Sequence, residues 1–445
     1  MTHHPRMQSL HGTTSVPGDK SISHRALILA ALADGSSQIE GFLPSGDCLA
    51  TLNCLCQLGV EIERIDERSV RVIGKGSDRF RPTEAPVHLD CHRSGTTMRL
   101  LAGTLAGQRV QATLLGEPQL LRRPMRRVVE PLREMGALID DTDGKAPLQI
   151  EGQALHGIEH QLAVPSAQVK SAILLAGLTA KGITRITQGT PTRDHTERML
   201  QRMGAPIVVN ETTSEVSIHN TRSLRPLSIS IPGDLSSAAF LLAGAVISPD
   251  SDVKLHRVGI NPTRTGLLDV LKTMGADIKI ITDEPGAFGN EPTATIRARS
   301  STLRGVTVDG ELVPRMIDEL PVLALLATQA FGTTIVRNAG ELRFKETDRI
   351  ETVANELRAL GAAITATTDG FVVEGPTPLH GANVSDHGDH RLAMMLAIAS
   401  LITSGNCPIV SGEDRTHDSF PGFFTMLEKL KVPRTRTQPV KRALR

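Results

Sequence analysis

The stretch GDKSISHRALILAALADG (residues 18–35) joins a polar cluster to a run of small apolar residues. The run is apolar on every side of a helix, which predicts a buried helix and not an amphipathic surface one. The polar cluster stands at the helix start, where backbone N–H groups lack partners and carry a partial positive charge. The stretch therefore predicts a buried helix whose N-terminus, with Lys20, Ser21 and Arg25, can bind an anion.

The same pairing recurs along the chain. The apolar runs of five further copies are RLLAGTLAG, SAILLAGLTAKG, AAFLLAGAVIS, PVLALLATQAFG and RLAMMLAIASLITSG. A second element, Leu-x-x-Met/Leu-Gly before a β-prone run, alternates with them and starts at Leu55, Leu132, Leu200, Leu271, Leu357 and, without the glycine, Leu427. Its glycine suits the end of a helix. The two alternating elements therefore predict repeats of strand, buried helix, strand and outer helix. Such repeats indicate an α/β fold.

The polar clusters predict where the function lies. At the six helix starts they read GDKSISHR, CHRSGTTMR, VPSAQVK, PGDLSSA, RMIDELP and DHGDHR. If the buried helices of each three-repeat half run parallel, their N-termini lie at the same end of that half. Two such halves, facing each other, would enclose a cleft suited to a highly anionic ligand. The alternative is that all six clusters are ordinary N-caps.

Composition limits the class of protein. A length of 445 residues favours two domains, and a net charge of +1 gives no bulk attraction to nucleic acid or membrane. The absence of Trp and Tyr argues against base stacking. The start MTHHPRMQSL lacks a signal-peptide run, no membrane-length apolar span follows, and the five cysteines show no CxxC spacing. We expect a cytoplasmic protein with reduced cysteines and a solvated basic tail, KVPRTRTQPVKRALR.

Two common kinds of ligand site do not fit the sequence. A nucleotide-binding P-loop needs glycine directly before its lysine, but Asp19 separates Gly18 from Lys20. The run SDHGDHR (residues 385–391) offers aspartates and histidines, but the ligands of one metal seldom follow each other so closely. The sequence therefore predicts neither a nucleotide loop nor a metal site.

Two arginine-rich or acidic segments hold further candidates. Arg123 precedes Pro124 at a helix start, where its guanidinium can bind phosphate or carboxylate through two hydrogen bonds. Arg126 and Arg127, which follow, are expected on a solvent face. Asp318, at the entry of an apolar helix, is either an N-cap or a base with a tuned pKa.

The segment ELRFKETDRI is open to two interpretations. Lys345 and Arg349 flank Glu346 at helical spacing, which is common for surface ion pairs. The same arrangement supplies two cations beside a carboxylate that could act as a general acid.

Taken in order, these clusters resemble the 5-enolpyruvylshikimate-3-phosphate synthase family over nearly the whole chain. The matching motifs are GDKSISHRALILAALADG, SGTTMRLLAG, RRPM, SAQVKSAILLAG, RDHTERML, PGDLSSAAF, NPTRTG, MIDELP, ELRFKETDR and DHRLAM. SAQVKSAILLAG, RDHTERML and NPTRTG look like the class II branch. The resemblance implies a two-domain inside-out α/β barrel of six βαβαββ repeats, with residues 20–231 in one domain and residues 1–19 and 232–445 in the other.

The resemblance also implies the reaction. The enolpyruvyl group of phosphoenolpyruvate would be joined to the 5-hydroxyl of shikimate 3-phosphate, with release of phosphate, through a tetrahedral intermediate. This is a step of chorismate and aromatic amino-acid biosynthesis. The resemblance implies a monomer without a cofactor and glyphosate as an inhibitor.

The resemblance assigns roles to matching residues. Asp318 matches the base for the 5-hydroxyl, and Glu346 matches the proton donor and acceptor at the pyruvyl methylene. Lys20 is the third expected catalytic residue, and Lys345 would assist on the hydroxyl side. Positions for shikimate 3-phosphate are matched by Lys20, Ser21, Arg25, Ser166, Ala167, Gln168, Arg193, Asp318 and Lys345. Positions for phosphoenolpyruvate are matched by Lys20, Gly95, Thr96, Arg123, Gln168, Arg349 and Arg391.

Some positions depart from the family pattern. Cys91, His92 and Arg93 stand where the family usually has Gly-Asn or Asn-Ser before its SGT loop. Asp418 stands where many members have a lysine, so we expect that contact with phosphoenolpyruvate to be missing. Gly95 is often alanine in glyphosate-tolerant class II members, so glycine predicts a sensitive enzyme.

Two other functions fit the sequence less well. The sister enzyme that acts on UDP-N-acetylglucosamine typically has a reactive cysteine near LLRRPM, but no cysteine lies between Cys91 and Cys407. It also has asparagine after the first-loop lysine, where this chain has Ser21. A non-catalytic repeat scaffold would leave Asp318 and Glu346 without a purpose. The transfer to shikimate 3-phosphate is therefore preferred, in a cleft whose halves close on their ligands.

Overall fold

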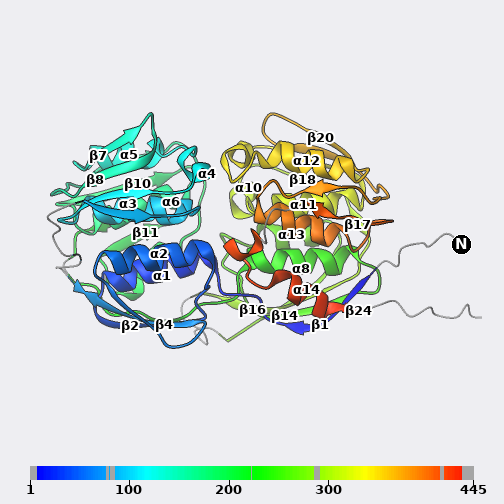
Figure 1. Cartoon of the computed structure of the whole chain (residues 1–445), viewed down its shortest axis with the longest axis horizontal. Coiled ribbons are helices and arrows are strands. Elements are labelled where there is room, and N and C mark those ends of the chain that lie inside the picture. The colour runs from blue at the N-terminus through cyan, green and yellow to red at the C-terminus, as the bar shows by residue number, and fades with distance from the viewer. Residues whose placement is uncertain are drawn as a thin grey trace, which may run out of the picture.

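The computed structural model describes residues 8–76, 80, 86–221, 223–284, 291–410 and 415–432. The first seven residues and residues 433–445 lie outside these ranges. Most of the predicted solvated tail lies there too, but its first two residues, Lys431 and Val432, form a short strand that pairs with Ser9 and Leu10. Helices and strands alternate and form two lobes that lie side by side (Figure 1). The lobe at the left of Figure 1 runs from blue to teal, and the lobe at the right from green to red, with the blue N-terminal strand β1 (Ser9–Thr14) at its lower edge.

The six predicted buried helices are present. Apart from a few residues in their first turns and Ile247, their residues are buried, because each run is apolar all round and packs against neighbouring elements on every side. They are α1 (Lys20–Ala31), α3 (Gly95–Ala106), α6 (Ala167–Gly177), α8 (Leu235–Ile247), α11 (Leu320–Thr328) and α13 (His390–Ala399).

Six outer helices alternate with them: α2 (Gly46–Gln57), α5 (Arg126–Glu134), α7 (His195–Arg202), α9 (Gly266–Thr273), α12 (Arg349–Ala359) and α14 (Phe423–Leu430). The first five are followed by the predicted glycines. Their φ angles are 83° at Gly59, 99° at Gly136, 80° at Gly204, 86° at Gly275 and 95° at Gly361. Glycine enters this left-handed region without steric cost, so the predicted helix ends are confirmed.

The second and third repeats show the complete βαβαββ unit. In the second, β5 (Val87–Asp90) lies parallel to β6 (Gln111–Leu115), and β8 (Lys145–Glu151) and β7 (Leu138–Thr142) extend the sheet antiparallel. The third repeats this order with β9 (Glu159–Leu162), β10 (Ile183–Gln188), β12 (Glu215–His219) and β11 (Ile207–Asn210). A strand, a buried helix, a strand, an outer helix and a hairpin thus form one unit.

The first and fourth repeats take one strand from elsewhere in the chain. Beside β2 (Asp34–Glu40), β4 (Ser69–Lys75) and β3 (Glu61–Arg64), the parallel edge strand is β13 (Ser228–Ser230). Beside β14 (Asp252–Gly259), β16 (Thr293–Arg299) and β15 (Asp277–Thr282), the parallel strand is β1 (Ser9–Thr14). The chain therefore crosses between the lobes twice.

The remaining two repeats are less regular. The fifth comprises β17 (Leu303–Arg304), β18 (Thr307–Val308), β19 (Ala330–Val336), β21 (Phe371–Gly375) and β20 (Ala363–Ala366). In the sixth, β22 (Val384–Ser385) pairs with β23 (Ile409–Val410), and β24 (Lys431–Val432) joins β1 in the sheet of the fourth repeat. In the sequence, too, the sixth repeat is irregular, because its Leu427 element lacks the glycine.

The two crossing segments lie against each other. Gly18 and Gly233 form an antiparallel bridge, Asp19 N donates to Pro232 O at 2.8 Å, and Asp234 N donates to Pro17 O at 2.9 Å. Buried apolar side chains form one cluster within residues 22–231, and a second cluster combines residues 10 and 16 with residues 235–430. The paired crossing thus connects two hydrophobic cores.

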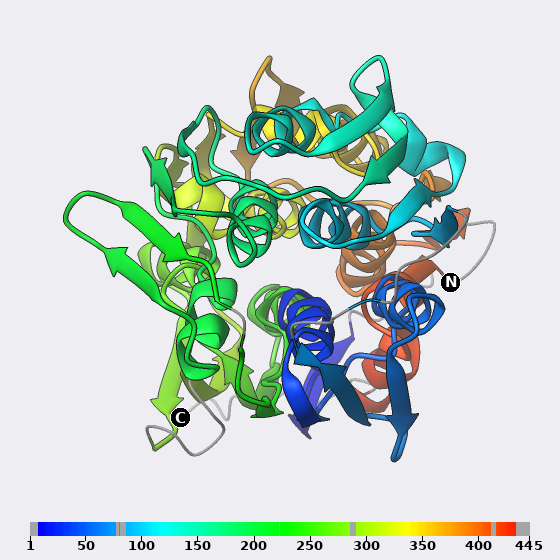
Figure 2. The same cartoon turned by 90° about the vertical axis from the view of Figure 1, so that its left-hand side faces the viewer.

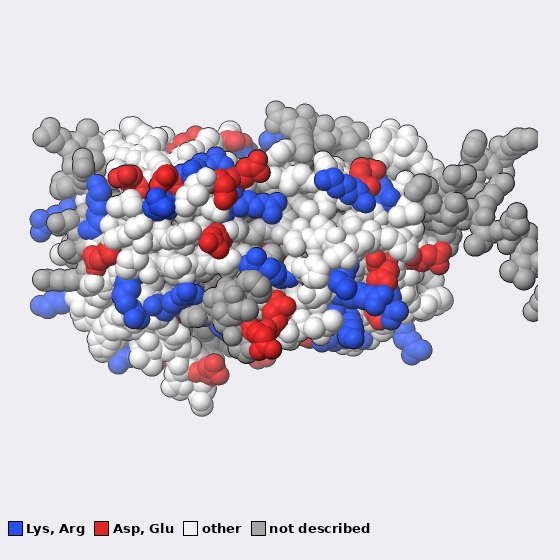
Figure 3. Space-filling model, turned by 90° about the horizontal axis from the view of Figure 1, so that it is seen from below, with Lys and Arg blue, Asp and Glu red and all other residues white. Residues whose placement is uncertain are grey.

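The architecture places helices inside and sheets outside. Figure 2 shows the buried helices near the middle of the lobe and the strands around its rim. On the face seen in Figure 3, acidic and basic side chains are interspersed, in keeping with the net charge of +1. Within the described residues, no helix combines the length and the apolar character needed to cross a membrane.

Candidate active site

A cavity of about 380 Å³ lies where the N-terminal ends of the buried helices meet. Residues in or just before the first turn of all six helices line it, so the prediction of one cleft walled by helix starts is confirmed. All fifteen candidate residues line the cavity: Lys20, Ser21, Arg25, Gly95, Thr96, Arg123, Ser166, Ala167, Gln168, Arg193, Asp318, Lys345, Glu346, Arg349 and Arg391.

The first loop provides a charged amine and an oriented hydroxyl. Lys20 Nζ lies 2.9 Å from Asp47 Oδ2. Burial alone would lower the pKa of Lys20, but the Asp47 carboxylate raises it, so the ammonium stays charged. Arg25 donates to Ser21 Oγ at 2.7 Å and to Ser21 O at 3.0 Å. Because Ser21 Oγ accepts this bond, its own hydrogen is free to point toward a ligand.

Arg25 is more buried than its sequence position indicates. Its Nε donates to Thr196 Oγ1 and its Nη2 to Ser171 Oγ, both at 2.8 Å. Burial lowers its pKa to about 10, which still leaves it charged at neutral pH. These bonds fix its guanidinium at the edge of the cavity, where it also orients Ser21.

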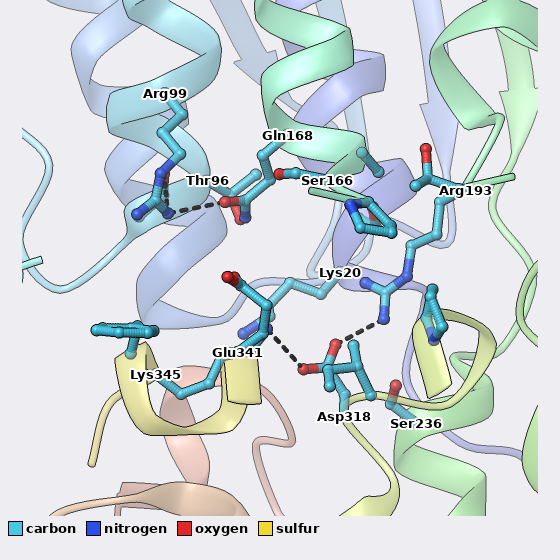
Figure 4. Close-up of a pocket in the computed structure, with 18 of the residues that line it drawn as sticks. Lys20, Thr96, Arg99, Ser166, Gln168, Arg193, Ser236, Asp318, Glu341 and Lys345 are labelled. Atoms are coloured by element: carbon cyan, nitrogen blue, oxygen red, sulfur yellow. Dashed lines mark hydrogen bonds and ion pairs between the residues drawn. The ribbon is translucent and has the colours of Figure 1, made fainter. Parts of the chain in front are cut away.

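An arginine that the sequence reasoning missed orients Gln168. Arg99 Nη1 donates to Gln168 Oε1 at 2.8 Å, and Gln168 Nε2 donates to Thr96 Oγ1 at 2.8 Å (Figure 4). Arg99 lines the cavity but is only 4% exposed. It stands within the quoted motif SGTTMR, one helical turn after Gly95, and that spacing could have indicated its proximity to the loop.

Asp318 is surrounded by four cations. Its carboxylate lies 2.6 Å from Arg193 Nη2, 3.5 Å from Lys345 Nζ, 3.6 Å from Arg349 Nη1 and 3.7 Å from Arg391 Nη2. Arg193 and Lys345 approach it from different sides of the cavity (Figure 4). Burial would raise the pKa of Asp318, but the cations hold it well below its usual range. Its carboxylate is therefore ionised.

Glu346 lies in the same half as Asp318, on the far side of the Arg349 guanidinium that both carboxylates contact. Arg349 Nη2 is 2.6 Å from its Oε2 and Arg123 Nη1 is 3.5 Å from its Oε1. Arg349 also donates from Nε to Asp389 Oδ2 at 2.8 Å. Against the effect of burial, Arg349 and Arg123 hold the pKa of Glu346 well below its usual range. Burial lowers the pKa of the neighbouring His390 to about 3, so that imidazole is neutral.

One expectation about the arginine cluster is wrong. Arg127, placed on a solvent face in the sequence analysis, lines the cavity, and its Nη1 lies 2.9 Å from Glu341 Oε2. Arg126 and Arg127 are the first two residues of α5. Because successive side chains of a helix point about 100° apart, only Arg127 turns into the cleft. Arg126 is exposed and pairs with Glu130 at 3.8 Å, as expected.

The departures from the family pattern meet in space. Arg93 Nη1 lies 3.3 Å from Asp418 Oδ2, although the two are far apart in sequence. Neither is among the described residues that line the cavity.

Arg264, in the motif NPTRTG, is a second cation that the sequence reasoning left without a role. It donates to Asp19 Oδ2 at 2.8 Å, to Asp234 Oδ1 at 3.1 Å and to Ser236 Oγ at 2.8 Å. Asp19 and Asp234 are the N-caps of α1 and α8, so one guanidinium ties together the starts of two helices from different lobes.

Within the described part of the chain, no group of three His, Cys, Asp or Glu side chains is arranged to hold a metal. Charged groups of the cavity pair with one another, as in Lys20–Asp47, Arg193–Asp318 and Arg349–Glu346. The cavity can bind small, multiply charged anions and offers two carboxylates for proton transfer.

Comparison with known proteins agrees with this chemistry. Residues 5–427 match the family model of EPSP synthase (3-phosphoshikimate 1-carboxyvinyltransferase). Two relatives of that name, from Bacillus licheniformis and Geobacillus kaustophilus, are 48% and 50% identical over 428 residues, which is 96% and 95% of this chain and 98% of each relative.

Solved structures agree with the sequence relatives. EPSP synthase from Acinetobacter baumannii superposes with a TM-score of 0.84 at 40% identity, over 96% of this chain and 97% of that one. The enolpyruvyl transferase NikO from Streptomyces tendae shares the fold, with a TM-score of 0.78 at 19% identity over 97% of this chain and 98% of that one. The chain therefore belongs to the EPSP synthase (3-phosphoshikimate 1-carboxyvinyltransferase) family.

Proposed function

We propose that the cavity is the active site of the carboxyvinyl transfer for which this family is named. The chain transfers the enolpyruvyl group of phosphoenolpyruvate to the 5-hydroxyl of shikimate 3-phosphate. In the addition step, the 5-oxygen bonds to C2 of phosphoenolpyruvate while the methylene carbon gains a proton. In the elimination step, the methyl group loses a proton and phosphate leaves.

The observation that supports this site best is the pair of carboxylates held among cations. Asp318 accepts the proton of the 5-hydroxyl, and Glu346 gives and then recovers the proton at the methylene carbon. Lys345, beside Asp318, assists on the hydroxyl side. Arginine and lysine side chains bind the phosphate and carboxylate groups and hold the reacting atoms together.

The two substrates are proposed to occupy adjoining parts of the cavity. Lys20 lies between them. Shikimate 3-phosphate is bound by Lys20, Ser21, Arg25, Ser166, Ala167, Gln168, Arg193, Asp318 and Lys345. Phosphoenolpyruvate is bound by Lys20, Gly95, Thr96, Arg123, Gln168, Arg349 and Arg391.

The direct test is substrate-dependent phosphate release. The purified protein is expected to release phosphate when shikimate 3-phosphate and phosphoenolpyruvate are both present, and not with either alone. Replacing shikimate 3-phosphate by UDP-N-acetylglucosamine should abolish the release. Phosphate release that requires the UDP-sugar instead would refute the assignment.

Glyphosate is proposed as an inhibitor, because Gly95 leaves room beside the phosphoenolpyruvate cations. A Cβ at this position would lie 2.7 Å from Arg99 Nη1 and 2.9 Å from Arg123 Nη1, so alanine must displace both guanidinium groups. Gly95→Ala is expected to raise the half-inhibitory glyphosate concentration by about tenfold or more. Gly189→Ala is a matched control, since no atom lies within 4 Å of its added Cβ. Equal inhibition of wild type and Gly95→Ala would contradict the prediction.

We further propose that residues 20–231 and residues 1–19 with 232–445 are the two moving domains, in a cytoplasmic monomer. The separate hydrophobic clusters and the paired crossing segments support this division. The mass of the protein in solution tests whether it is a monomer. A mass of 47.7 kDa is expected, and a multiple of it would contradict the proposal.

A further inference from the structure

Arg93 lies outside the substrate cavity and bonds to both halves of the molecule. It follows His92, whose φ is 49°, in the turn before α3. Its Nε and Nη2 donate to Gln119 Oε1 at 3.0 and 2.8 Å, within the same half. Nη2 also donates to Gly388 O at 2.7 Å, and Nη1 lies 3.3 Å from Asp418 Oδ2, both in the other half. Its side chain is only 12% exposed.

Other ion pairs that cross the cleft differ from this one. Arg193 meets Asp318 at 2.6 Å and Arg127 meets Glu341 at 2.9 Å, and all four residues line the cavity. Phosphate and carboxylate groups of ligands compete with these carboxylates for the arginines. Arg93 and its partners are not among the described residues that line the cavity, so ligand entry leaves their bonds in place.

Gln119, in α4 (Pro118–Leu121), connects Arg93 to the reacting groups. Because Arg93 donates twice to its Oε1, the amide nitrogen must point the other way. Its Nε2 donates to the main-chain oxygen of Glu346 at 2.6 Å. Glu346 directly follows Lys345, so this bond ties the main chain that carries both side chains to the opposite half.

We propose that Arg93 is a positioning residue that holds the two halves together from outside the substrate cavity and, through Gln119, sets the main chain of Glu346. The arginine fork makes this possible, because it bonds to Gln119, Gly388 and Asp418 at once. The kinetic consequence rests on the proposed role of Glu346, whereas the effect on the distance between the halves does not.

The test combines small-angle X-ray scattering with steady-state kinetics on the full chain. Arg93→Ala is expected to enlarge the radius of gyration without ligands and to lower kcat/KM for phosphoenolpyruvate by roughly tenfold or more, as for loss of charge-assisted hydrogen bonds. Arg93→Lys should recover only part of this, because a single ammonium can replace Nη2 but not also Nε, which contacts Gln119, and Nη1, which contacts Asp418. Asp418→Asn should have a smaller effect than Arg93→Ala, since it leaves the other contacts intact.

Arg126→Ala is the matched control, because Arg126 is exposed and its pair with Glu130 stays within one half. It should leave both measurements unchanged. The proposal is overturned if Arg93→Ala matches wild type in scattering and kinetics, or if it lowers only the melting temperature. If wild type releases no phosphate, the proposed function fails, while the scattering comparison still decides whether Arg93 holds the halves together.

Discussion

At the scale of single residues, buried arginines decide where the polar groups of the cavity point. Arg25 makes Ser21 Oγ an acceptor, and Arg99 fixes the amide of Gln168. These hydrogen bonds hold each group in one orientation, and such preorganisation lowers the entropy cost of binding. Sequence reasoning found Ser21 and Gln168, but not the orienting role of Arg99, because bonds between distant helices leave no pattern in the sequence.

The two carboxylates provide a prediction at this scale. Asp318→Ala and Glu346→Ala are each expected to lower kcat by about 10²–10⁴-fold, the usual effect of losing a general acid or base. Binding of shikimate 3-phosphate should persist, because the cations that faced the lost carboxylate remain. Kinetics and calorimetry measure the two effects. Glu351→Gln, an exposed change on α12, is the control, and near-normal turnover of either alanine variant would refute that role.

His390 provides a prediction about pH. Burial lowers its pKa from 6.5 to about 3, so the unfolded chain binds this proton more readily than the folded one. Its contribution to stability is complete above pH 6.5 and is lost as the pH falls toward 3. Between pH 6.5 and 5 it should cost roughly 1.5 kcal/mol in the free energy of unfolding. Denaturant unfolding should show a flatter pH dependence in His390→Asn, and equal slopes would contradict the prediction.

At the scale of elements, the periodicity of the sequence identified what the chain forms but not what it pairs with. Uniformly apolar runs became buried helices, and the glycines ended the outer helices, because both effects are local. The partners of β1 and β13 could not be identified in this way, because each of these strands pairs with a strand far away in the sequence. Only the family resemblance assigned residues 1–19 to the second half.

Arg264 provides the prediction for this scale, since it joins the N-caps of α1 and α8. Arg264→Ala leaves Asp19 and Asp234 buried without their shared cation, which is expected to lower the free energy of unfolding by about 3–5 kcal/mol. Arg297→Ala breaks a half-exposed ion pair with Asp252, and should change the free energy of unfolding by less than about 1 kcal/mol. Similar losses of unfolding free energy in both variants would show that the buried Arg264 cluster stabilises the fold no more than an ion pair near the surface.

At the scale of the whole molecule, the two lobes present opposite charges to each other across the cavity. Arg193 faces Asp318 and Arg123 faces Glu346, so the halves contact each other through these pairs. The convergence of six helix starts was predictable from the repeat. The pairing of particular charges was not, because it depends on the angle between the lobes.

Closure provides the prediction at this scale. Anions bound between the lobes bridge cations of both halves, so the compact form should gain population when both substrates are present. The radius of gyration from small-angle scattering is expected to decrease on adding shikimate 3-phosphate and phosphoenolpyruvate together, and less with either alone. Identical scattering profiles with and without both substrates would refute domain closure.

The two strands that cross between the lobes also constrain the order of events during synthesis. β2 leaves the ribosome long before β13, so the first sheet keeps an unpaired edge until residues 228–230 emerge. β1 is made first, yet it must wait for residues 252–259 to form its parallel partner. An unpaired edge is a site for wrong association. A nascent chain that stalls before the second crossing would therefore carry a lobe with an open sheet and a leading strand without a partner.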